Sequence, residues 1–139
     1  RRKSETIEWI EGDLLALPFD DGSFDAATVG FGVRAVADLD AALRELRRVL
    51  RPGGRLAILE ITQPRGLLKP FFSLWFDRIV PALGRVAGDP DAYAYLPSSV
   101  KRFPGPEALA ARMAGAGLTD VRWILTAGGI IALHVGTVR

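Results

Sequence analysis

The sequence predicts an α/β fold whose sheet contains a parallel pair of strands. Three segments carry this prediction: a buried-type strand at residues 24–32, an amphipathic helix after Asp38, and a second buried-type strand at residues 55–62. A strand, a helix and a strand in so short a span are typical of a right-handed crossover between parallel strands. We therefore expect a sheet that is covered by helices.

Two candidate strands open the chain. The segment "IEWIEGD" at residues 7–13 alternates apolar and acidic residues and ends in a Gly-Asp turn, which predicts a strand with one half-exposed face. The segment "FDAATVGFG" at residues 24–32 is apolar on both faces after Asp25, as expected inside a parallel sheet that is covered on both sides. The "DDG" between them is typical of a turn.

The next segment, "DLDAALRELRRVL", predicts a helix that begins after Asp38, whose side chain is a suitable N-cap. Its leucines recur every three or four residues and form one apolar stripe: Leu39, Leu43, Leu46 and Leu50. Pro52 and the glycines after it end this helix, and "RLAILEIT" at residues 55–62 then predicts a buried strand.

The second half of the chain departs from this rhythm. A further helix is expected to place on one face Phe72, Trp75 or Phe76, Ile79 and Leu83. A last helix starts near Pro106 and ends at Gly117, and two strands around a Gly-Gly pair then predict an antiparallel hairpin. No repeat, low-complexity segment or linker interrupts the sequence, so we expect one domain over residues 1–139.

The amino-acid composition argues against several classes of function. The 139 residues include no cysteine and one histidine, His134, which argues against disulfides and against a conventional zinc or iron site. The net charge of +2 is small and the arginines are scattered, so a nucleic-acid partner is not expected. No apolar run of about 18 residues and no signal peptide is present, so a cytoplasmic location is the default expectation.

Open α/β sheets bind ligands at the carboxyl ends of their strands. Asp13 follows the first candidate strand, and Gly30 and Gly32 end the second. The carboxylate can accept a hydrogen bond, and the glycines allow a flat ligand to approach the backbone. From the residue types alone, a turn-forming Gly-Asp pair and tight packing are the commoner explanation.

Three longer stretches add a family resemblance: "GDLLALPFDDGSFDAATVGFGVR", "DLDAALRELRRVLRPGGRLAILEIT" and "GGIIALHVG". Together they resemble the ubiquinone/menaquinone biosynthesis C-methyltransferase family, a branch of the class I S-adenosylmethionine-dependent methyltransferases. The motifs "LPF", "SFD" and "RVLRPGG" occur throughout the superfamily, whereas "FGVR", "AYAYLPSSVKRFP" and "GGIIALHVG" in this order are more specific to the quinone branch. The resemblance runs from about Gly12 to the C-terminus.

This resemblance implies a three-layer Rossmann-like sheet, mostly parallel with a C-terminal antiparallel hairpin. Residues 7–11 match the third strand of the family. The first two strands, with the glycine-rich loop and the acidic residue that contact the cofactor, are then expected upstream of Arg1. The chain corresponds to the C-terminal portion of a methyltransferase domain.

The resemblance also implies site residues. Asp13 matches the residue beside the adenine of S-adenosyl-L-methionine, Leu14 supplies the next backbone amide, and Gly30 faces the reactive end of the cofactor. Arg34 matches an arginine implicated in handling the quinol, although the next residue is Ala35 where the family usually has Asn.

For the other candidate substrate contacts, the sequence leaves two interpretations open. Tyr93 and Tyr95 are equally consistent with hydrogen bonds to the quinol oxygens and with packing at the rim. His134, in the last strand, is expected to be structural rather than a catalytic base. The aromatic residues 71–76 suit either core packing or the entrance for a polyprenyl tail.

The implied reaction is methylation of a ring carbon of a polyprenyl quinol, demethylmenaquinol to menaquinol in the leading interpretation. Arg34 stays protonated at neutral pH, so it is expected to orient a water or stabilise a developing phenolate rather than to act as a base. From residue type alone, a salt-bridged arginine is the stronger alternative. Because the substrate is a lipid, peripheral contact at the inner face of the membrane is a hypothesis.

Two other functions stay open. The chain is also consistent with a catalytically inactive fragment that acts as a binding or dimerising module. Without the first strand of the family's sheet, an edge of the fourth strand is expected to be exposed, and an exposed edge pairs readily with another chain, as in a homodimer. A methyltransferase of the same fold with another small-molecule acceptor is the third interpretation.

Overall fold

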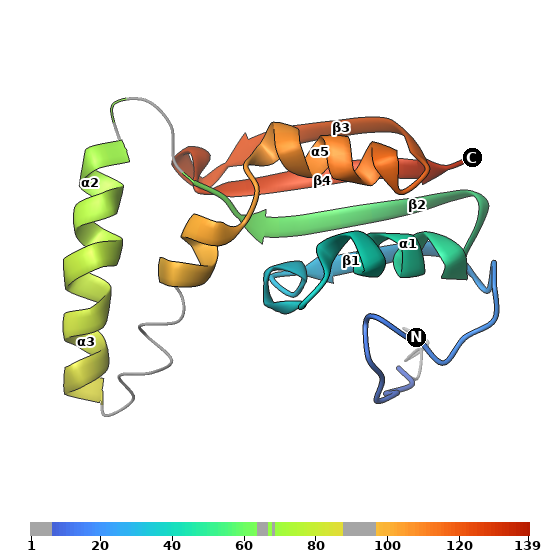
Figure 1. The fold of residues 1–139 in the computed structure, drawn as a ribbon, viewed down its shortest axis with the longest axis horizontal. Helices are drawn as coiled ribbons and strands as arrows, with labels where there is room; N and C mark the ends of the chain where they lie inside the picture. Colours follow the sequence, from blue (N-terminus) through green and yellow to red (C-terminus); the bar gives the residue numbers. More distant parts are fainter. Residues whose placement is uncertain (1–6, 64–66, 68, 88–96) are drawn as a thin grey trace, which may run out of the picture.

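The computed structural model describes residues 7–63, 67, 69–87 and 97–139 (Figure 1). Its centre is a four-stranded sheet with the strand order β1-β2-β4-β3. The strands are β1 (Phe24–Gly30), β2 (Leu50–Ile61), β3 (Leu118–Thr126) and β4 (Ile131–Val138). β1 and β2 are parallel, whereas β4 is antiparallel to both β2 and β3. The predicted α/β sheet with its C-terminal antiparallel hairpin is confirmed.

Helix α1 (Leu39–Val49) makes the crossover between the two parallel strands. The carboxylate of Asp38 caps it by accepting a hydrogen bond from the Ala41 N–H at 2.9 Å, as predicted. β2 begins immediately after this helix, earlier than predicted, because Leu50 already pairs with Phe24.

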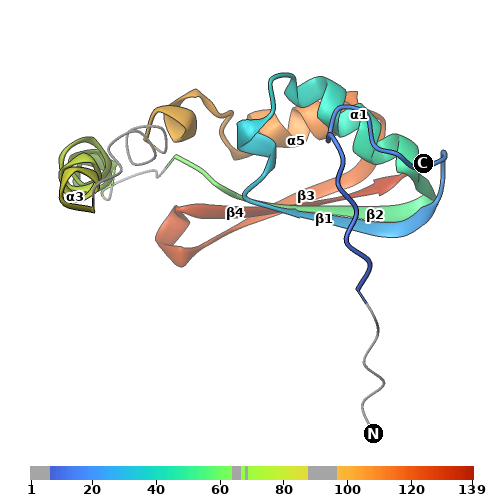
Figure 2. The ribbon, with the colours of Figure 1, turned by 90° about the horizontal axis from the view of Figure 1, so that it is seen from below.

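Helix α5 (Pro106–Gly115) lies beside α1 on the same face of the sheet (Figure 2). Side chains from both helices meet the sheet in one apolar core, whose most buried members are Leu43, Leu56, Ile58, Leu109 and Met113. Gly136 allows close packing here, because a Cβ on it would lie only 3.2 Å from the Leu118 Cβ and 3.4 Å from the Met113 Cε. The core thus forms between one sheet face and two helices.

The opposite face of the sheet is apolar but carries no helix from the described residues. Its side chains are half-buried: Ala57, Leu59, Leu133 and Val135. Both helices that pack on the sheet lie on the other side (Figure 2). The described residues therefore supply two of the three layers that the resemblance implies.

Residues 69–87 form one continuous helix beyond the carboxyl end of β2 (Figure 1). It consists of α2 (Lys69–Leu74), a π turn η3 (Trp75–Ile79) and α3 (Val80–Ala87). A helix was predicted here, but the predicted face was wrong in its second half. A π turn contains one extra residue, so Val80 is buried in line with Phe72 and Phe76, while Ile79 and Leu83 are exposed.

The prediction of a strand at residues 7–13 is wrong. Residues 7–12 have no regular secondary structure, and Asp13 forms only an isolated bridge with Ala16. Trp9 is 88% exposed. Alternation of apolar and acidic residues is not sufficient for a strand, because the segment also needs a neighbouring strand with which to share hydrogen bonds.

The prediction that residues 24–32 lie in a sheet covered on both sides is confirmed for one face only, because no described helix covers the other face. β1 ends at Gly30 and pairs only with β2 among the described strands, so it is an edge strand. Ala27 and Val29 face the core, whereas Ala26 and Thr28 are exposed. The carboxyl ends of β1 and β2 lie side by side, as predicted, and this arrangement positions the candidate site.

Candidate functional site at the carboxyl ends of β1 and β2

A 3-10 turn, η1 (Val33–Ala35), follows β1 and lies against the end of β2. The Phe31 N–H donates to the Leu59 carbonyl at 2.8 Å, and this bond continues the ladder past the end of β1. Phe31 has a φ of +56°, an uncommon conformation for an aromatic residue. The chain therefore turns sharply here and brings Arg34 back over the sheet.

Arg34 forms an ion pair with Glu60 on β2. The guanidinium Nη1 donates to Glu60 Oε1 at 2.6 Å, and the Arg34 backbone N–H donates to Oε2 at 3.3 Å. Glu60 also accepts a hydrogen bond from the Ile61 N–H at 2.9 Å. The glutamate is 1% exposed and the arginine side chain 10%, so this carboxylate fixes both the backbone and the side chain of Arg34.

Beside this ion pair lies a cavity of about 390 Å³ between η1 and the segment that precedes α5. Three guanidinium groups contribute to its wall: Arg34, Arg102 and Arg112. The Nε of Arg34 is buried and has no hydrogen-bond partner within the described residues. A buried donor without a partner is costly to the folded state.

A second, smaller cavity of about 160 Å³ lies between α2 and residues 97–102, which are helical. Phe72, Phe76 and Val100 make it largely apolar. Gln63 joins its two walls by donating from Nε2 to the Lys101 carbonyl at 2.8 Å. The short helix at residues 97–102 contributes to both cavities, so a polar and an apolar compartment share one wall.

Asp13 does not reach this site through any polar contact in the described part of the chain. Its Oδ1 accepts a hydrogen bond from the Leu15 N–H at 2.9 Å, and its carbonyl accepts one from the Ala16 N–H at 3.0 Å. These are the contacts of a local turn. Leu14 is half-buried against the core.

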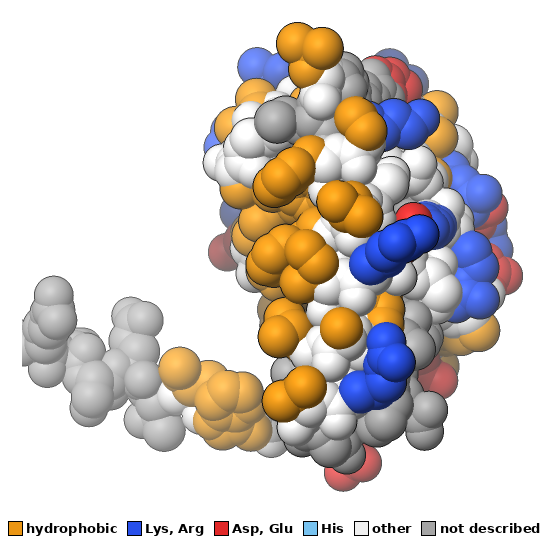
Figure 3. Space-filling model, turned by 90° about the vertical axis from the view of Figure 1, so that its left-hand side faces the viewer, with side chains coloured by type: hydrophobic (Ala, Val, Ile, Leu, Met, Phe, Trp, Pro, Cys, Tyr) orange, Lys and Arg blue, Asp and Glu red, His pale blue; other side chains and the backbone are white. Residues whose placement is uncertain are grey.

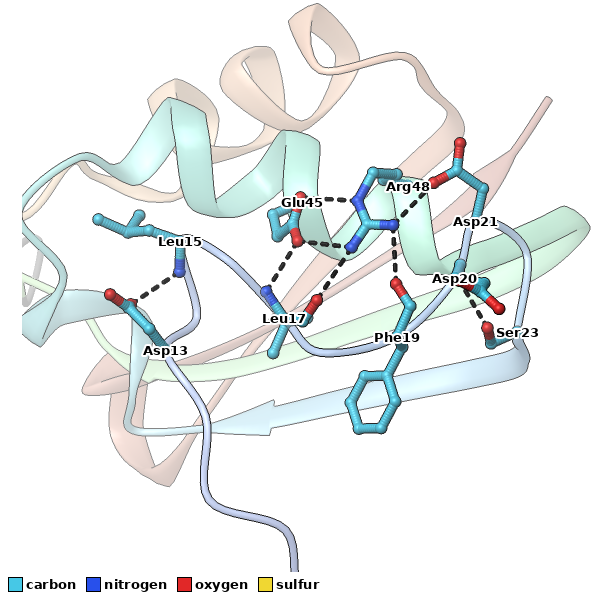
Figure 4. A network of polar contacts seen from close by, with 9 residues as sticks. All are labelled: Asp13, Leu15, Leu17, Phe19, Asp20, Asp21, Ser23, Glu45 and Arg48. Atoms are coloured by element: carbon cyan, nitrogen blue, oxygen red, sulfur yellow. Dashed lines mark hydrogen bonds and ion pairs between the residues drawn. The ribbon is translucent and has the colours of Figure 1, made fainter.

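Arg48 on α1 binds residues 17–21, the segment after this turn (Figure 4). Its guanidinium donates to Glu45 and Asp21, both at 2.7 Å, and to the Phe19 carbonyl at 2.8 Å. Glu45 in turn accepts a hydrogen bond from the Leu17 N–H at 2.8 Å. The hydrogen bond from Arg48 lowers the pKa of Glu45. Residues 17–21 are thereby fixed on the helix face.

Gly30 and Arg34 do lie at the same edge of the sheet, as expected. Gly30 is exposed, and a Cβ on it would meet nothing within 4 Å, so open space adjoins the backbone there. Tyr93 and Tyr95 lie outside the described residues.

His134 has a structural environment, as the sequence suggested. It is 1% exposed under α5, and its Nε2 donates to the Pro106 carbonyl at 2.8 Å. Burial lowers its pKa, which favours the neutral imidazole. The side chain thus holds the start of α5 on β4.

Sequence reasoning missed Glu60 and the cavity arginines Arg102 and Arg112. The signal for Glu60 was present: it is the one charged residue in the apolar run "LAILEI", and a buried carboxylate needs a cationic partner. The signal for the two arginines was absent, because they come from separate helical segments that only the fold brings to one cavity.

Comparison with known proteins places this site in context. The model of the ubiE/COQ5 methyltransferase family matches residues 1–138. The demethylmenaquinone methyltransferase of Thermus thermophilus is 49% identical, over 98% of this chain and 64% of its own length. The ubiquinone/menaquinone biosynthesis C-methyltransferase UbiE of Rubrivivax gelatinosus is 42% identical, over 94% of this chain and 53% of its own length. The chain thus spans between 53% and 64% of the length of these two curated relatives.

Solved structures show a likeness in the fold. A SAM-dependent methyltransferase from Thermotoga maritima aligns with a TM-score of 0.64 at 21% identity, over 94% of this chain and 63% of its own. A SAM dependent methyltransferase from Aquifex aeolicus also gives 0.64, at 15% identity, over 97% of this chain and 56% of its own. The Rossmann-like methyltransferase architecture expected from the sequence is confirmed.

Proposed function

Because the chain belongs to the ubiE/COQ5 methyltransferase family, we propose that it takes part in methylation of a ring carbon of a polyprenyl quinol, with demethylmenaquinol as the first candidate. The single observation that carries this proposal is Arg34, held by the buried Glu60 at the wall of a cavity beside the carboxyl ends of β1 and β2. We take residues 1–139 as one domain that forms the C-terminal portion of a methyltransferase domain.

S-Adenosyl-L-methionine is the proposed cofactor, and it would supply an electrophilic methyl group. Asp13 and Leu14 are the proposed contacts for the adenine, and Gly30 leaves the backbone open toward the reactive end. The exposure of Asp13 and the open space beside Gly30 support this assignment.

Arg34 is the proposed catalytic and substrate-binding residue. Its guanidinium remains protonated, so it donates hydrogen bonds to an acceptor oxygen and stabilises the negative charge that develops there as the hydroxyl gives its proton to a solvent water. Glu60 is a positioning residue, because it holds the guanidinium through Nη1 and leaves the buried Nε without a protein partner among the described residues. Tyr93 and Tyr95 are proposed to bind the quinol oxygens.

The paired cavities support a substrate with a polar head and an apolar tail. The arginine-lined cavity suits an oxygen-bearing ring, and the Phe72 and Phe76 cavity next to it suits the first part of a polyprenyl chain. A lipid substrate of this kind also supports contact with a membrane surface.

The outer edge of β1 supports a homodimer. No described strand pairs with this edge, and unpaired strand edges readily add another strand. Sedimentation velocity over a range of protein concentrations tests this state. A concentration-dependent shift to a dimer is expected, and a monomer at every concentration would contradict it.

A methyl-transfer assay tests the proposed function. The 139-residue chain is incubated with methyl-labelled S-adenosylmethionine and a reduced demethylmenaquinone, and label in the ring methyl is measured. Replacing Arg34 by Met is expected to lower kcat by about 10²-fold or more, as for removal of an oxyanion donor elsewhere. Arg44→Met, an exposed change on α1, is the matched control and is expected to keep the wild-type rate. Label transfer that does not depend on Arg34 would contradict the assignment.

A further inference from the structure

A band of exposed hydrophobic side chains runs along the outer side of the helix at residues 69–87. Its six members leave between 38% and 89% of their surface open: Phe71, Leu74, Trp75, Ile79, Leu83 and Val86. Figure 3 shows these hydrophobic side chains gathered on one face, with Lys and Arg side chains along one border. We call this surface the outer band. Exposed hydrophobic side chains that gather on one face often mark an interaction site.

The outer band is not simply the unpacked side of a poorly seated helix. The opposite side of the same helix contacts the rest of the protein through Phe72, Phe76 and Val80, and the rings of the two phenylalanines stack with their centroids 5.5 Å apart. Asp77 adds an ion pair with Lys101 on the neighbouring short helix. The helix therefore has one face toward the protein and a second, equally apolar face toward solvent.

The charges beside the outer band are almost all positive. Residues 69–87 contain three basic residues, Lys69, Arg78 and Arg85, and a single acidic one, Asp77. The carboxylate of Asp77 is already compensated by Lys101. The surface thus combines an apolar strip, a tryptophan and a basic border, which is the composition of helices that lie in the interface of an anionic bilayer.

We propose that the outer band binds the surface of an anionic lipid bilayer. No helix among the described residues is long and apolar enough to cross a membrane, so the contact is with one leaflet and the helix lies parallel to it. Phe71, Trp75 and Val86 enter the region between the headgroups and the acyl chains, and Lys69 and Arg85 remain at the level of the lipid phosphates.

Two features favour a bilayer over a second copy of this chain. In a symmetric dimer formed through the outer band with the two helices antiparallel, the basic borders of the two copies would face each other with few acidic groups to compensate them. The inner side of the same helix also forms a wall of the apolar cavity, through Phe72 and Phe76. This second argument rests on the proposed function, because a polyprenyl tail that leaves the bilayer would enter that cavity directly.

Vesicle co-sedimentation with the 139-residue chain tests the proposal without any methylation assay. The vesicles are phosphatidylcholine alone or phosphatidylcholine mixed with phosphatidylglycerol. Binding to the anionic vesicles is expected, with weaker binding to the neutral ones and in high salt. Replacing both Lys69 and Arg85 by Gln is expected to weaken anionic binding by about 25-fold, at about fivefold per basic residue.

The apolar part is tested with Phe71→Glu and Val86→Glu together, which place two charges in the band and are expected to abolish binding. Ile124→Glu on β3 is the matched control, because Ile124 is 62% exposed and Phe71 67%, and it is expected to bind as the wild type does. Circular dichroism checks that each variant folds.

Fluorescence quenching by brominated lipids locates the contact. Quenching is expected in the wild type and is expected to fall in Trp75→Phe, which retains the exposed Trp9. Three results would overturn the proposal: no binding to anionic vesicles, binding that survives the double glutamate change, or a dimer in solution that this change disrupts. The failure of methyl transfer alone would leave these readouts intact and would bear only on the proposed function.

Discussion

The Arg34 guanidinium and the Glu60 carboxylate meet at 2.6 Å, and Glu60 is 1% exposed. Glu60→Gln would remove the negative charge and leave Arg34 largely buried without a counterion. Such a change costs about 3 kcal/mol of unfolding free energy or more. Urea titration followed by circular dichroism measures this loss.

The exposed ion pair between Arg51 and Asp25, at 2.8 Å, is a matched control. Asp25→Asn is expected to change the unfolding free energy by less than about 1 kcal/mol, because solvent screens the pair. Replacing both buried partners, as Arg34→Met with Glu60→Leu, is expected to recover most of the stability and none of the activity. A Glu60→Gln protein as stable as the wild type would show that the pair is not buried in solution.

His134 predicts a dependence of stability on pH. Burial lowers its pKa below the ordinary value of 6.5, against the opposing effects of the Pro106 carbonyl and the Glu107 carboxylate. The unfolded chain therefore takes up a proton near pH 6.5 while the folded protein does not. The free energy of unfolding is expected to fall as the pH drops from 6.5 toward the lowered pKa.

The His134→Gln variant tests this assignment, because its amide still donates to the Pro106 carbonyl but does not titrate. Urea midpoints measured through this pH range are expected to depend less on pH in the variant than in the wild type. Equal slopes in the two proteins would assign the dependence to other groups.

Glu45 predicts a second, more acidic transition. The hydrogen bond from Arg48 lowers the pKa of Glu45, so its contribution to stability is present above the ordinary value of 4.5 and is lost as the pH falls through the lowered pKa. Arg48→Met is expected to return this pKa toward 4.5, which NMR titration of the Glu45 carboxyl measures.

The same substitution is expected to speed hydrogen exchange at the Leu17 amide, because Glu45 loses the contact that orients it. Arg44→Met, on the exposed side of α1, is the control for both measurements. Unchanged exchange at Leu17 in Arg48→Met would mean that the arginine does not fasten the segment.

Two glycines at the end of α5 predict opposite effects of the same substitution. Gly117 has a φ of +97°, and a Cβ on it would lie 2.6 Å from the Arg47 Nε. Gly117→Ala is therefore expected to lower the unfolding free energy by about 1–3 kcal/mol. Gly115 has no neighbour within 4 Å of such a Cβ, so Gly115→Ala is expected to raise it by about 0.5–1 kcal/mol. Thermal unfolding of the two variants decides between these signs.

The sequence predicted well those elements whose signals are local. Helix α1 follows from Asp38 and the spacing of its leucines, and the hairpin of β3 and β4 follows from its glycine turn. Residues 7–13 were misassigned because alternation describes a face and does not identify a pairing partner.

The residues of the candidate site also differ in whether a local signal in the sequence identifies them. Gly30 was identified because it ends a strand that the sequence reveals, and Arg34 because it matches an arginine of the family that the sequence resembles. The partner of Arg34 was missed because Glu60 lies 26 residues away, and hydrophobic patterning hides one charge in a buried strand. Asp13 shows that a local signal can also be ambiguous. A Gly-Asp pair that resembles a ligand contact also forms an ordinary turn.

The π turn at Trp75–Ile79 sets the rotational phase of its helix. In an α-helix, side chains four residues apart drift around the axis by about 40° per step. The wider π turn rotates the chain less per residue and so compensates for this drift. Phe72, Phe76 and Val80 therefore stay on one side of the helix. If the same residues formed an α-helix without the π turn, everything after the turn would be rotated by up to about 100°. The two halves of the helix would then no longer present their apolar sides to the same plane.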